Sequence, residues 1–519
     1  MQTDRVEQAM RAGQRLHRIH GGLRLQHNKS VSCELPVAKA ALPPRLYVPL
    51  PGPIGVGVGL LVKPGQRVRK GDPIARSDPG AGGWVHAPTS GTVDSVVSHP
   101  VSHPSGREGP CVVIEPDGLD GWTDLHPLDD WRLADPGELR RVISEAGIVG
   151  LGGAVFPTGV KVAEASERGI HTLILNGAEC EPYISCDQML MREQPASIVL
   201  GARILQRAVG ARRTIIAIED QMDAVRHALE GALREAAAAD IEIVTVAAVY
   251  PQGGEKQLVQ ALTGLEVPGG GRPTDLGLLC QNVATATAVA RAVAEGKPLV
   301  ERIVTVTGNG VRRPRNLLAP VGAPIASLIE QCGGYEPNAA RLVLGGPMMG
   351  YPLATDSSPV IKAANCILVL TADDIRPPQP EMPCIRCGEC ARVCPALLLP
   401  QQIAWTVRNG LWDEAIDFGL SDCIECGCCD FVCPSHIPLV DWFRHGKLEL
   451  RLRAAERRRA DIARERFEAR EARLARIKRE RGERMAEKKR VLADEGARQE
   501  KIAAAVERAR SRNRGKDAT

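Results

Sequence analysis

The spacing of hydrophobic and polar positions differs between successive segments of the chain. Over residues 55–98, short runs of alternating apolar and polar positions are separated by Pro-Gly, Lys-Gly and Ser-Gly pairs. A period of two is typical of strands, and these pairs are typical of turns. The pattern therefore predicts a small β-domain near the N-terminus.

From about residue 135 the pattern changes to alternating helices and strands. Asp135 and Pro136 open the sequence DPGELRRVISEAG, which predicts a helix with Asp135 as its N-cap and the proline in its first turn. Apolar runs predict strands at 171–176, 212–218 and 241–249, and helical spacing predicts a helix at 222–236. This alternation is typical of an α/β domain with a largely parallel sheet, which binds its ligand at the strand ends.

The segment after residue 446 is rich in Arg, Glu and Ala and has no sustained heptad repeat. It is expected to form one solvated helix or to be disordered. Because basic residues exceed acidic ones here, contact with anionic lipid or a partner stays open beside a merely solvated charge run. A nucleic-acid-binding role is not expected, since aromatic residues make up only 3% of the chain and no recognition fold is evident.

No segment is expected to cross a membrane. The longest uncharged apolar stretch, 46–62, is interrupted by three prolines and several glycines, which a spanning helix would not tolerate. The N-terminal residues are charged throughout, unlike a secretory signal. We therefore expect a cytoplasmic protein, in which the 16 cysteines are metal ligands or buried thiols and not disulfides.

Eight of the cysteines form two identical runs. Each run has the spacing Cys-x-x-Cys-x-x-Cys-x-x-x-Cys-Pro, and each position of the first recurs 39 residues later, as from Cys384 to Cys423. This is the signature of a two-cluster ferredoxin, in which the fourth cysteine of each run ligates the other cluster. One [4Fe–4S] cluster is thus expected on Cys384, Cys387, Cys390 and Cys433, and the other on Cys423, Cys426, Cys429 and Cys394.

Structural zinc is the alternative to iron–sulfur clusters at these cysteines. Such sites usually need two separated Cys-x-x-Cys pairs for each metal, so this register disfavours them. Cys428 falls outside the spacing and is expected to be a packed thiol. The remaining seven cysteines have no mutual metal-binding spacing and are expected to be small buried side chains; they are Cys33, Cys111, Cys180, Cys186, Cys280, Cys332 and Cys366.

A glycine-rich loop follows the first predicted helix of the α/β domain. It runs from Gly150 to Lys161 and includes Gly152 and Gly153, so its backbone could approach a phosphate or a flavin ring. It is not the dinucleotide-binding fingerprint, because Val155 stands where the third glycine would be and no strand precedes the loop. An ordinary turn is the alternative.

Polar residues follow the predicted strands of the same domain. Asn176 begins the sequence NGAECEP, which carries Glu179 and Glu181, and Glu255 and Asn282 occupy similar loops. Helix capping explains such residues as readily as ligand binding. Their position at one edge of a parallel sheet makes them candidates for a shared site.

Two resemblances add to these predictions. The segment 55–98 resembles the barrel-sandwich fold of lipoyl and biotinyl carrier domains, but the hairpin tip at 78–84 has no lysine, so we expect a structural domain. The motifs at 150–161, 176–182, 253–255 and 282–285 resemble, in the same order, the FMN- and NADH-binding subunit of respiratory complex I. With the tandem ferredoxin motif, the whole of 15–446 resembles the C subunit of the Rnf/Rsx ion-translocating electron-transport complex.

The resemblance implies roles for individual residues. It implies that Phe156 and Glu181 lie near the nicotinamide of NADH. It implies FMN contacts from Gly150, Gly152, Gly153, Lys161, Asn176, Glu255 and Asn282. The chain departs from the complex I pattern at four positions, where it has Val155 for Gly, Ala178 for Asp, Lys256 for Glu and Gln281 for Asn.

The expected architecture is a multidomain α/β protein in five parts. A carrier-like β-domain without an attachment lysine is expected at 1–130 and an FMN/NADH-type α/β domain at 131–300. By resemblance, a β-grasp, soluble-ligand-binding domain follows at 301–372. A tandem [4Fe–4S] ferredoxin domain at 376–446 and a basic charged tail at 447–519 complete the chain.

The leading functional hypothesis is an electron-transfer subunit of a membrane-bound translocase. Hydride transfer moves two electrons and a [4Fe–4S] cluster accepts one, so a flavin is the natural link between NAD(H) and ferredoxin. The resemblance implies docking on membrane subunits at the cytoplasmic face of the bacterial inner membrane, with NAD(H):ferredoxin chemistry coupled to ion translocation. The alternative is a non-enzymatic ferredoxin adaptor whose flavin-type domain is only a scaffold.

Overall fold

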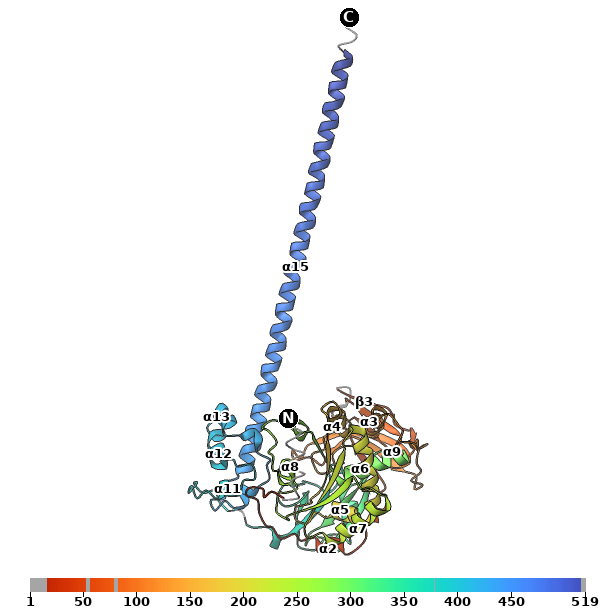
Figure 1. The fold of residues 1–519 in the computed structure, drawn as a ribbon, viewed down its shortest axis with the longest axis vertical. Helices are drawn as coiled ribbons and strands as arrows, with labels where there is room; N and C mark the ends of the chain where they lie inside the picture. The colour runs from red at the N-terminus through yellow and green to blue at the C-terminus, as the bar shows by residue number, and fades with distance from the viewer. Residues whose placement is uncertain (1–15, 53–56, 79–82, 378, 515–519) are drawn as a thin grey trace. The chain divides into compact units, whose positions relative to one another are not determined.

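The computed structural model describes residues 16–52, 57–78, 83–377 and 379–514 (Figure 1). The chain forms two compact units that divide between Arg444 and His445. The first unit contains two sandwiched antiparallel sheets, a parallel sheet with helices, a mixed six-stranded sheet and a small helical region. The expectation of a multidomain α/β protein is confirmed.

The N-terminal β-domain is a sandwich of two antiparallel sheets. One sheet has the order β2-β8-β7-β4 and the other β3-β5-β6. Val48, Ile74 and Ile114 are among the side chains buried between them. The strands are β2 Leu46–Pro49, β3 Val58–Leu60, β4 Arg67–Val68, β5 Pro73–Ser77, β6 Trp84–His86, β7 Gly91–Pro100 and β8 Glu108–Pro116. The hairpin tip that lacks a lysine includes residues 79–82, which lie outside the described part of the chain.

The α/β domain has a four-stranded parallel sheet in the order β11-β10-β9-β12. The three strands expected from sequence are present as β9 Thr172–Gly177, β10 Arg213–Glu219 and β11 Ile241–Val246, and β12 Leu278–Asn282 completes the sheet. The helices are α3 Pro136–Glu145, α4 Thr158–Ser166, α5 Cys186–Glu193, α6 Pro195–Val209, α7 Asp223–Glu235, α8 Glu255–Thr263 and α9 Val283–Glu295, with a 3₁₀ turn η2 at Pro273–Leu276.

Local sequence explains these elements. Asp135 Oδ1 accepts a hydrogen bond of 2.7 Å from Gly137 N, so the expected N-cap of α3 is confirmed. Strands β9 and β10 are buried along nearly their whole length, as expected for a parallel sheet covered on both faces. The main core of the domain consists mostly of Leu, Ile, Val and Ala side chains from these strands and helices.

A mixed sheet follows, in the order β1-β14-β13-β17-β15-β16. Its elements are β13 Glu301–Thr307, β14 Arg315–Pro320, α10 Ile325–Gln331, β15 Ala339–Leu344, β16 Tyr351–Pro352, β17 Cys366–Thr371 and the 3₁₀ turn η3 Ala372–Asp374. The edge strand β1 Ala38–Lys39 comes from the N-terminal part of the chain and pairs in parallel with β14. This pairing was not predicted from the sequence.

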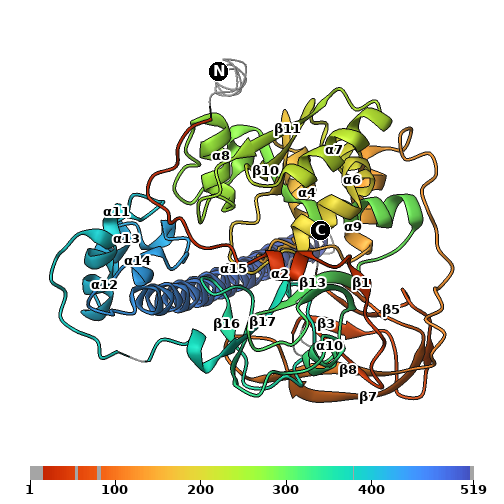
Figure 2. The same cartoon turned by 90° about the horizontal axis from the view of Figure 1, so that it is seen from below.

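The cysteine-rich region is built from short helices (Figure 2). They are α11 Glu389–Arg392, α12 Pro400–Arg408, α13 Trp412–Asp417, the 3₁₀ turn η4 Leu420–Asp422, and α14 Cys428–Phe431. The helix α15 Leu439–Arg514 begins here, and Phe443 in its second turn is 1% exposed. The beginning of α15 therefore packs in the core of the first unit.

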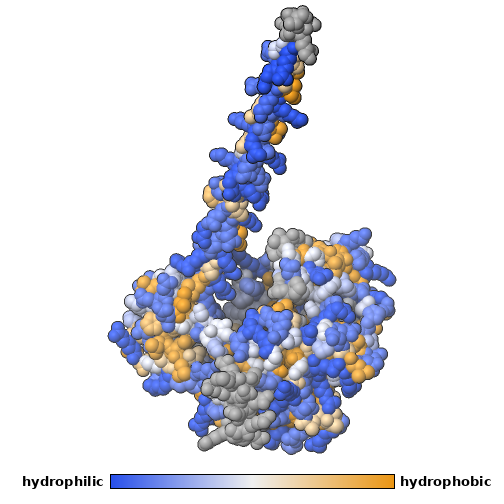
Figure 3. Space-filling model, turned by 45° about the horizontal axis from the view of Figure 1, so that its top comes forward, coloured by the Kyte–Doolittle hydropathy of each residue, from blue (hydrophilic) through white to orange (hydrophobic). Residues whose placement is uncertain are grey.

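The second unit is the remainder of α15. Every residue from 456 to 512 is exposed, and Figure 3 shows a mainly hydrophilic surface along it. Ion pairs such as Asp461–Arg464, at 2.9 Å, connect neighbouring turns. Of the two expectations for the tail, the solvated helix is confirmed.

Residues 16–33, which we call the N-terminal strap, run along the α/β domain to the short helix α2 Ser30–Cys33 (Figure 2, in red). His17 N donates to Ala261 O in α8 at 2.9 Å, and Tyr183 N donates to His27 O at 2.7 Å. Leu23 pairs with Tyr250 through two backbone hydrogen bonds. The strap thus holds together segments that are far apart in sequence.

Candidate functional site

The glycine-rich loop lies between α3 and α4 and closes on itself. Gly150 N donates to Phe156 O at 2.9 Å, and Val155 N donates to Gly150 O at 3.2 Å. Gly153 has φ +105°, and a Cβ added to it would meet no atom within 4 Å. The loop therefore presents bare backbone beside open space, as a cofactor cradle requires.

Val155 occupies the position at which the complex I pattern has glycine. Its φ is +52°, a left-handed conformation that is strained for a β-branched residue. A valine thus stands here in a conformation that glycine adopts at little cost.

Asn282 connects the loop to the sheet. Its Oδ1 accepts from Ala284 N at 2.8 Å and caps α9, and its Nδ2 donates to Asp187 Oδ2 at 2.6 Å. A Cβ on Gly152 would lie 3.4 Å from the Cβ of Asn282. Asn282 and Asn176 are register partners on β12 and β9. Two residues expected to contact FMN therefore lie side by side at the carboxyl edge of the sheet, and one of them lies beside the loop.

Lys161 and Glu255 also meet at this edge. Lys161 Nζ lies 2.9 Å from Glu255 Oε2 and donates to Cys280 O at 2.7 Å. Asn176 Nδ2 donates to Gly253 O at 2.8 Å. The segment that precedes α8 is thus tied to β9 and to α4, which brings the remaining expected FMN contacts together.

Three buried polar side-chain atoms in the same elements have no hydrogen-bond partner among the described residues. They belong to Thr158 at the start of α4, Gln257 in the first turn of α8, and Gln281 at the end of β12. Buried polar groups are normally paired. Together with the Lys161 ammonium and the bare loop backbone, these groups fit a polar cofactor such as FMN.

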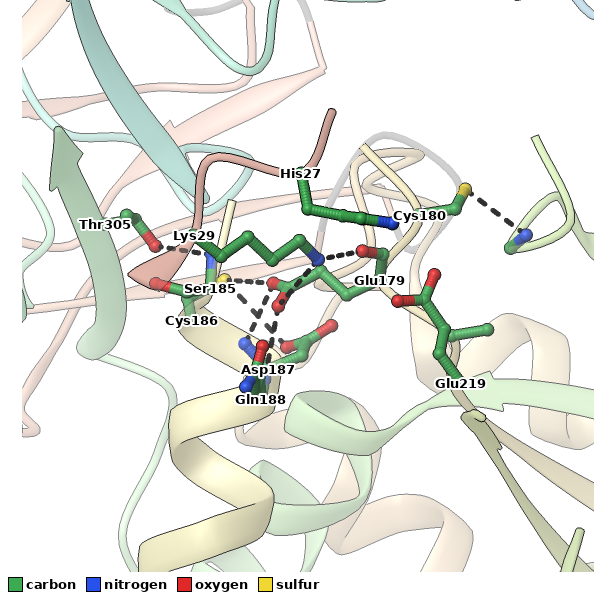
Figure 4. A network of polar contacts seen from close by, with 12 residues as sticks. His27, Lys29, Glu179, Cys180, Ser185, Cys186, Asp187, Gln188, Glu219 and Thr305 are labelled. Carbon is green, nitrogen blue, oxygen red and sulfur yellow. Dashed lines mark hydrogen bonds and ion pairs between the residues drawn. The ribbon is translucent and has the colours of Figure 1, made fainter. Parts of the chain in front are cut away.

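Glu179 and Glu181 have separate surroundings. The carboxylate of Glu179 accepts from Asp187 N at 3.0 Å and Gln188 N at 3.2 Å at the start of α5, and Lys29 of the strap bonds its backbone carbonyl (Figure 4). Glu181 Oε1 accepts from Met348 N at 2.7 Å and Met349 N at 3.1 Å. Burial raises the pKa of Glu181. Both carboxylates therefore already have partners in the chain.

Phe156 and Glu181 have different partners. Phe156 is 37% exposed, and the guanidinium carbon of Arg272 lies 5.6 Å from its ring centroid. Among the described residues, no hydrogen bond, ion pair or ring contact joins Phe156 to Glu181. The structure thus groups the expected FMN contacts but does not pair the two residues expected near the nicotinamide.

Two buried charged residues at this site were not predicted from the sequence. Lys29 is 5% exposed and pairs with Glu179 at 3.8 Å, but nothing in its own segment marks it as a partner. Asp187 is buried and accepts a hydrogen bond from Asn282. Burial is the main cause that raises its pKa to about 7, and the charge of Glu179 is the next. The place of Asp187 at the first turn of a helix that follows the Asn176 motif was the available signal.

Cys186 lies beside these two carboxylates. Each of three residues offers one atom that could bind a metal, and these atoms lie within 4.8 Å of one another; the residues are Glu179, Cys186 and Asp187. Because the Glu179 carboxylate already caps α5 and faces Lys29, we interpret this group as structural support for the site.

The cysteine-rich region repeats in backbone as well as in sequence. Non-glycine residues with positive φ recur at the same offset of 39 positions, as Arg386 (58°) and Glu425 (57°), and Leu397 (55°) and His436 (51°). The helices α11 and α14 recur at that offset as well. The duplication inferred from the cysteine spacing is therefore also structural.

The surroundings of the thiols match the crossed arrangement expected for one cluster. Burial raises the pKa of Cys429, and the neighbouring charges of Asp430, Cys423, Cys426 and Cys394 raise it further. The fourth cysteine of the first run thus lies near cysteines of the second run. Glu425 N donates to Cys423 Sγ at 3.4 Å, as backbone amides do around cluster thiolates.

Cys390 belongs to the other group. Burial raises its pKa first, and the charges of Cys384 and Cys387 raise it further. Cys428 is 1% exposed and packs against Tyr250, as expected for a buried thiol. Of the seven cysteines outside the motif, five are buried, while Cys33 and Cys180 are half-buried.

Four family models match the chain, each within the range expected for the corresponding domain. They are the RnfC barrel sandwich hybrid domain at 17–119, the Nuo51 FMN-binding domain at 143–291, the SLBB domain at 303–352 and a 4Fe-4S dicluster domain at 383–437. The expected FMN and [4Fe–4S] cofactors are confirmed by these matches.

Curated relatives match most of the chain. The chain is 41% identical over 460 residues to the C subunit of the ion-translocating oxidoreductase complex of Haemophilus influenzae, covering 88% of this chain and 70% of that protein. The chain belongs to this family. The corresponding C subunits of Pseudomonas aeruginosa and Edwardsiella ictaluri are 46% and 44% identical over 89% and 97% of this chain. The chain spans 59% and 62% of their lengths.

A solved structure gives a weaker match. An NAD⁺-reducing [NiFe]-hydrogenase in the H₂-reduced state aligns with a TM-score of 0.43 and 20% identity, covering 59% of this chain and 62% of that chain. Within the described part of this chain, no helix combines the length and the apolar character needed to cross a membrane.

Proposed function

We propose that the chain exchanges electrons between NAD(H) and a low-potential carrier such as ferredoxin through FMN and two [4Fe–4S] clusters. The observation that carries this proposal is that one compact unit contains both the flavin-type edge and the eight-cysteine motif. FMN, when bound, supplies the conversion between a two-electron hydride and single electrons. Both halves of such a reaction are thus represented in one chain.

The chain's own residues would bind and orient the flavin. Gly152 keeps a side chain out of the volume beside Asn282, and Gly153 leaves bare backbone beside open space. Lys161 offers a positive charge, Asn176 fixes the segment before α8, and Asn282 caps α9 at the sheet edge. Phe156, at the exposed end of the loop, is available to stack on a nicotinamide ring. We assign Glu181 to the nicotinamide side of the site.

One observation favours the adaptor alternative. Glu181 Oε1 already accepts hydrogen bonds from two backbone amides of the loop between β15 and β16. These two hydrogen bonds must break before the same oxygen can contact a nucleotide. In an adaptor, these hydrogen bonds would be permanent and the flavin-type domain would serve as a scaffold.

The visible absorption spectrum decides between the two functions. Protein reconstituted anaerobically and loaded with FMN should lose absorbance in the flavin and cluster bands when NADH is added. If NADH bleaches nothing, even with membrane partners present, the enzyme proposal is wrong and the adaptor replaces it.

We also propose that the chain acts as a peripheral subunit at the cytoplasmic face of the inner membrane. The relatives are named as subunits of an ion-translocating complex, which supports partners in that membrane. Alkaline carbonate should release the protein from membranes, and retention after carbonate treatment would show an anchor and contradict this placement.

A further inference from the structure

The two cysteine groups differ in exposure. In the group with Cys423, the residues Cys394, Cys426 and Cys429 are 9% exposed or less, and Cys423 itself is half-buried. In the other group, Cys384 and Cys387 are exposed, and Ile385 between them is 68% exposed. One cluster site is thus enclosed by protein, and the other opens to solvent.

The enclosed site is the one that contacts the flavin-type domain. The hydroxyl of Tyr250 donates to Cys426 O at 2.6 Å, and Lys256 pairs with Asp422 at 3.8 Å. Tyr250 lies in the segment that leads into Glu255, and Lys256 is the residue directly after Glu255. The enclosed site is therefore connected through a few residues to the edge that holds the flavin contacts.

The loop between β15 and β16 makes a second connection. Met348 N donates to Glu181, and a Cβ on Gly427 would lie 3.1 Å from Met348 O. Met348 also packs with Tyr250 and Cys426. The same short loop thus touches Glu181 on one side and the cysteine loop of the enclosed site on the other.

The N-terminal strap closes the same junction. His20 Nδ1 lies 2.9 Å from Cys394 O, and Gly22 N donates to Val393 O at 2.9 Å. One residue further on, Leu23 pairs with Tyr250. The backbone of Cys394, the crossed ligand of the enclosed site, is thereby fixed relative to the flavin-type domain.

The exposed site has local contacts. Met382 N donates to Ser435 O, Ser435 Oγ donates to Pro383 O, and Cys390 Sγ donates to Gln401 Oε1 at 3.2 Å. Within the described ranges, none of the hydrogen bonds of this group reaches the flavin-type domain. Its exposed edge is open to another molecule.

We propose that the two clusters act in a fixed order, with the Cys394, Cys423, Cys426 and Cys429 cluster next to the flavin and the other cluster exchanging electrons with the external carrier. This order rests on the proposed function. Each passage moves one electron from centre to centre and changes no bond. One NADH therefore yields NAD⁺, one proton and two electrons, which reduce two one-electron carriers in two successive passages, and the order applies equally in reverse.

The order can be tested without NADH or flavin. Cys387 and Cys426 hold equivalent positions in the repeat, so Cys387→Ser and Cys426→Ser are matched variants. After dithionite reduction, chromium(III) oxalate in solution should enhance the EPR relaxation of the cluster left in Cys426→Ser severalfold more than that of the cluster left in Cys387→Ser. Equal enhancement, or the opposite ranking, would overturn the proposal.

NADH then tests the sequence of transfer in FMN-loaded protein. In Cys387→Ser, NADH should reduce the remaining cluster at a rate within about threefold of wild type. In Cys426→Ser, dithionite should still reduce the remaining cluster. NADH should reduce that cluster at least tenfold more slowly than it reduces wild type. Equal rates in the two variants would contradict the order. An unreactive wild-type protein would contradict the proposed function, and the relaxation ranking would still report which cluster is exposed.

A third variant keeps all cysteines in place, in case either serine variant loses both clusters. Tyr250→Phe removes the hydroxyl that bonds to Cys426 O, so it should change the EPR signal that chromium oxalate relaxes weakly and leave the strongly relaxed signal unchanged. Tyr335→Phe is the control, because its hydroxyl bonds to Asp356 at 2.9 Å in the mixed sheet domain. A change in the strongly relaxed signal alone would mean that Tyr250 lies beside the solvent-exposed cluster, which would contradict the proposed order.

Discussion

Lys161 Nζ lies 2.9 Å from Glu255 Oε2, so two residues expected to contact the same cofactor form an ion pair with each other. Removing the lysine would leave the Glu255 carboxylate facing the expected phosphate. We predict that Lys161→Ala lowers FMN affinity about ten- to a hundredfold, or about 1.5–3 kcal/mol. The double variant with Glu255→Gln should recover part of this loss. Flavin fluorescence titration measures both, and equal affinity of the two variants would show that Glu255 does not face the cofactor.

Val155→Gly should relax the glycine-rich loop. Relief of a left-handed valine is worth about 1–2 kcal/mol, and the added flexibility of glycine costs about 0.5–1 kcal/mol. A gain of about 0.5–1 kcal/mol in thermal stability is therefore expected, with FMN binding retained. Val142→Gly, inside α3, should show the opposite sign. Differential scanning fluorimetry compares the two, and destabilisation by Val155→Gly would argue against a strained φ.

Glu181→Gln tests the nicotinamide side of the site. Glutamine keeps an oxygen that accepts from Met348 N and Met349 N, so the loop between β15 and β16 should stay in place. FMN should still bind, while reduction by NADH slows about tenfold or more. Stopped-flow spectroscopy of FMN-loaded protein measures this rate. An unchanged rate would remove Glu181 from the reaction.

Asp187 predicts a pH dependence of stability. Its pKa rises from 3.8 to about 7 on folding, chiefly through burial. Between pH 4 and pH 7 the unfolded chain therefore binds fewer protons at this residue than the folded chain, so its contribution to stability is present below pH 4 and is lost as the pH rises to 7.

Asp187→Asn removes this titration and keeps an oxygen to accept from Asn282 Nδ2. The variant's melting temperature should therefore fall less than that of wild type between pH 4.5 and pH 7.5. Parallel pH profiles of the two proteins would show that Asp187 does not titrate in this range.

Cys428→Ala tests the ligand assignment. Cys428 is buried beside Cys426 and lies outside the repeated spacing, so the variant should retain about eight irons per chain after reconstitution. Cys433→Ala should instead damage the cluster held by Cys384, Cys387 and Cys390. Iron analysis and EPR spectroscopy report both outcomes. Loss of four irons in Cys428→Ala would make Cys428 a ligand.

The sequence predicted those features of the fold and the site that depend on residues close together in the chain. The Asp135 cap, the strands of the parallel sheet and the cysteine repeat each depend on residues within a few positions of one another, and all are present. The contacts of Lys29 with Glu179 and of Gly22 with Val393 depend on tertiary packing. No periodicity or spacing records such contacts, so the strap could not be predicted.

The strap also constrains the order in which the chain can fold during synthesis. Gly22 is made about 370 residues before Val393, the residue that accepts its backbone hydrogen bond. At about 5–20 residues per second, the early segment waits on the order of 20 to 70 s for its partner. We therefore expect the stretch around Gly22 in ribosome-bound chains to stay open to proteases until the first cysteine run, which contains Val393, has emerged.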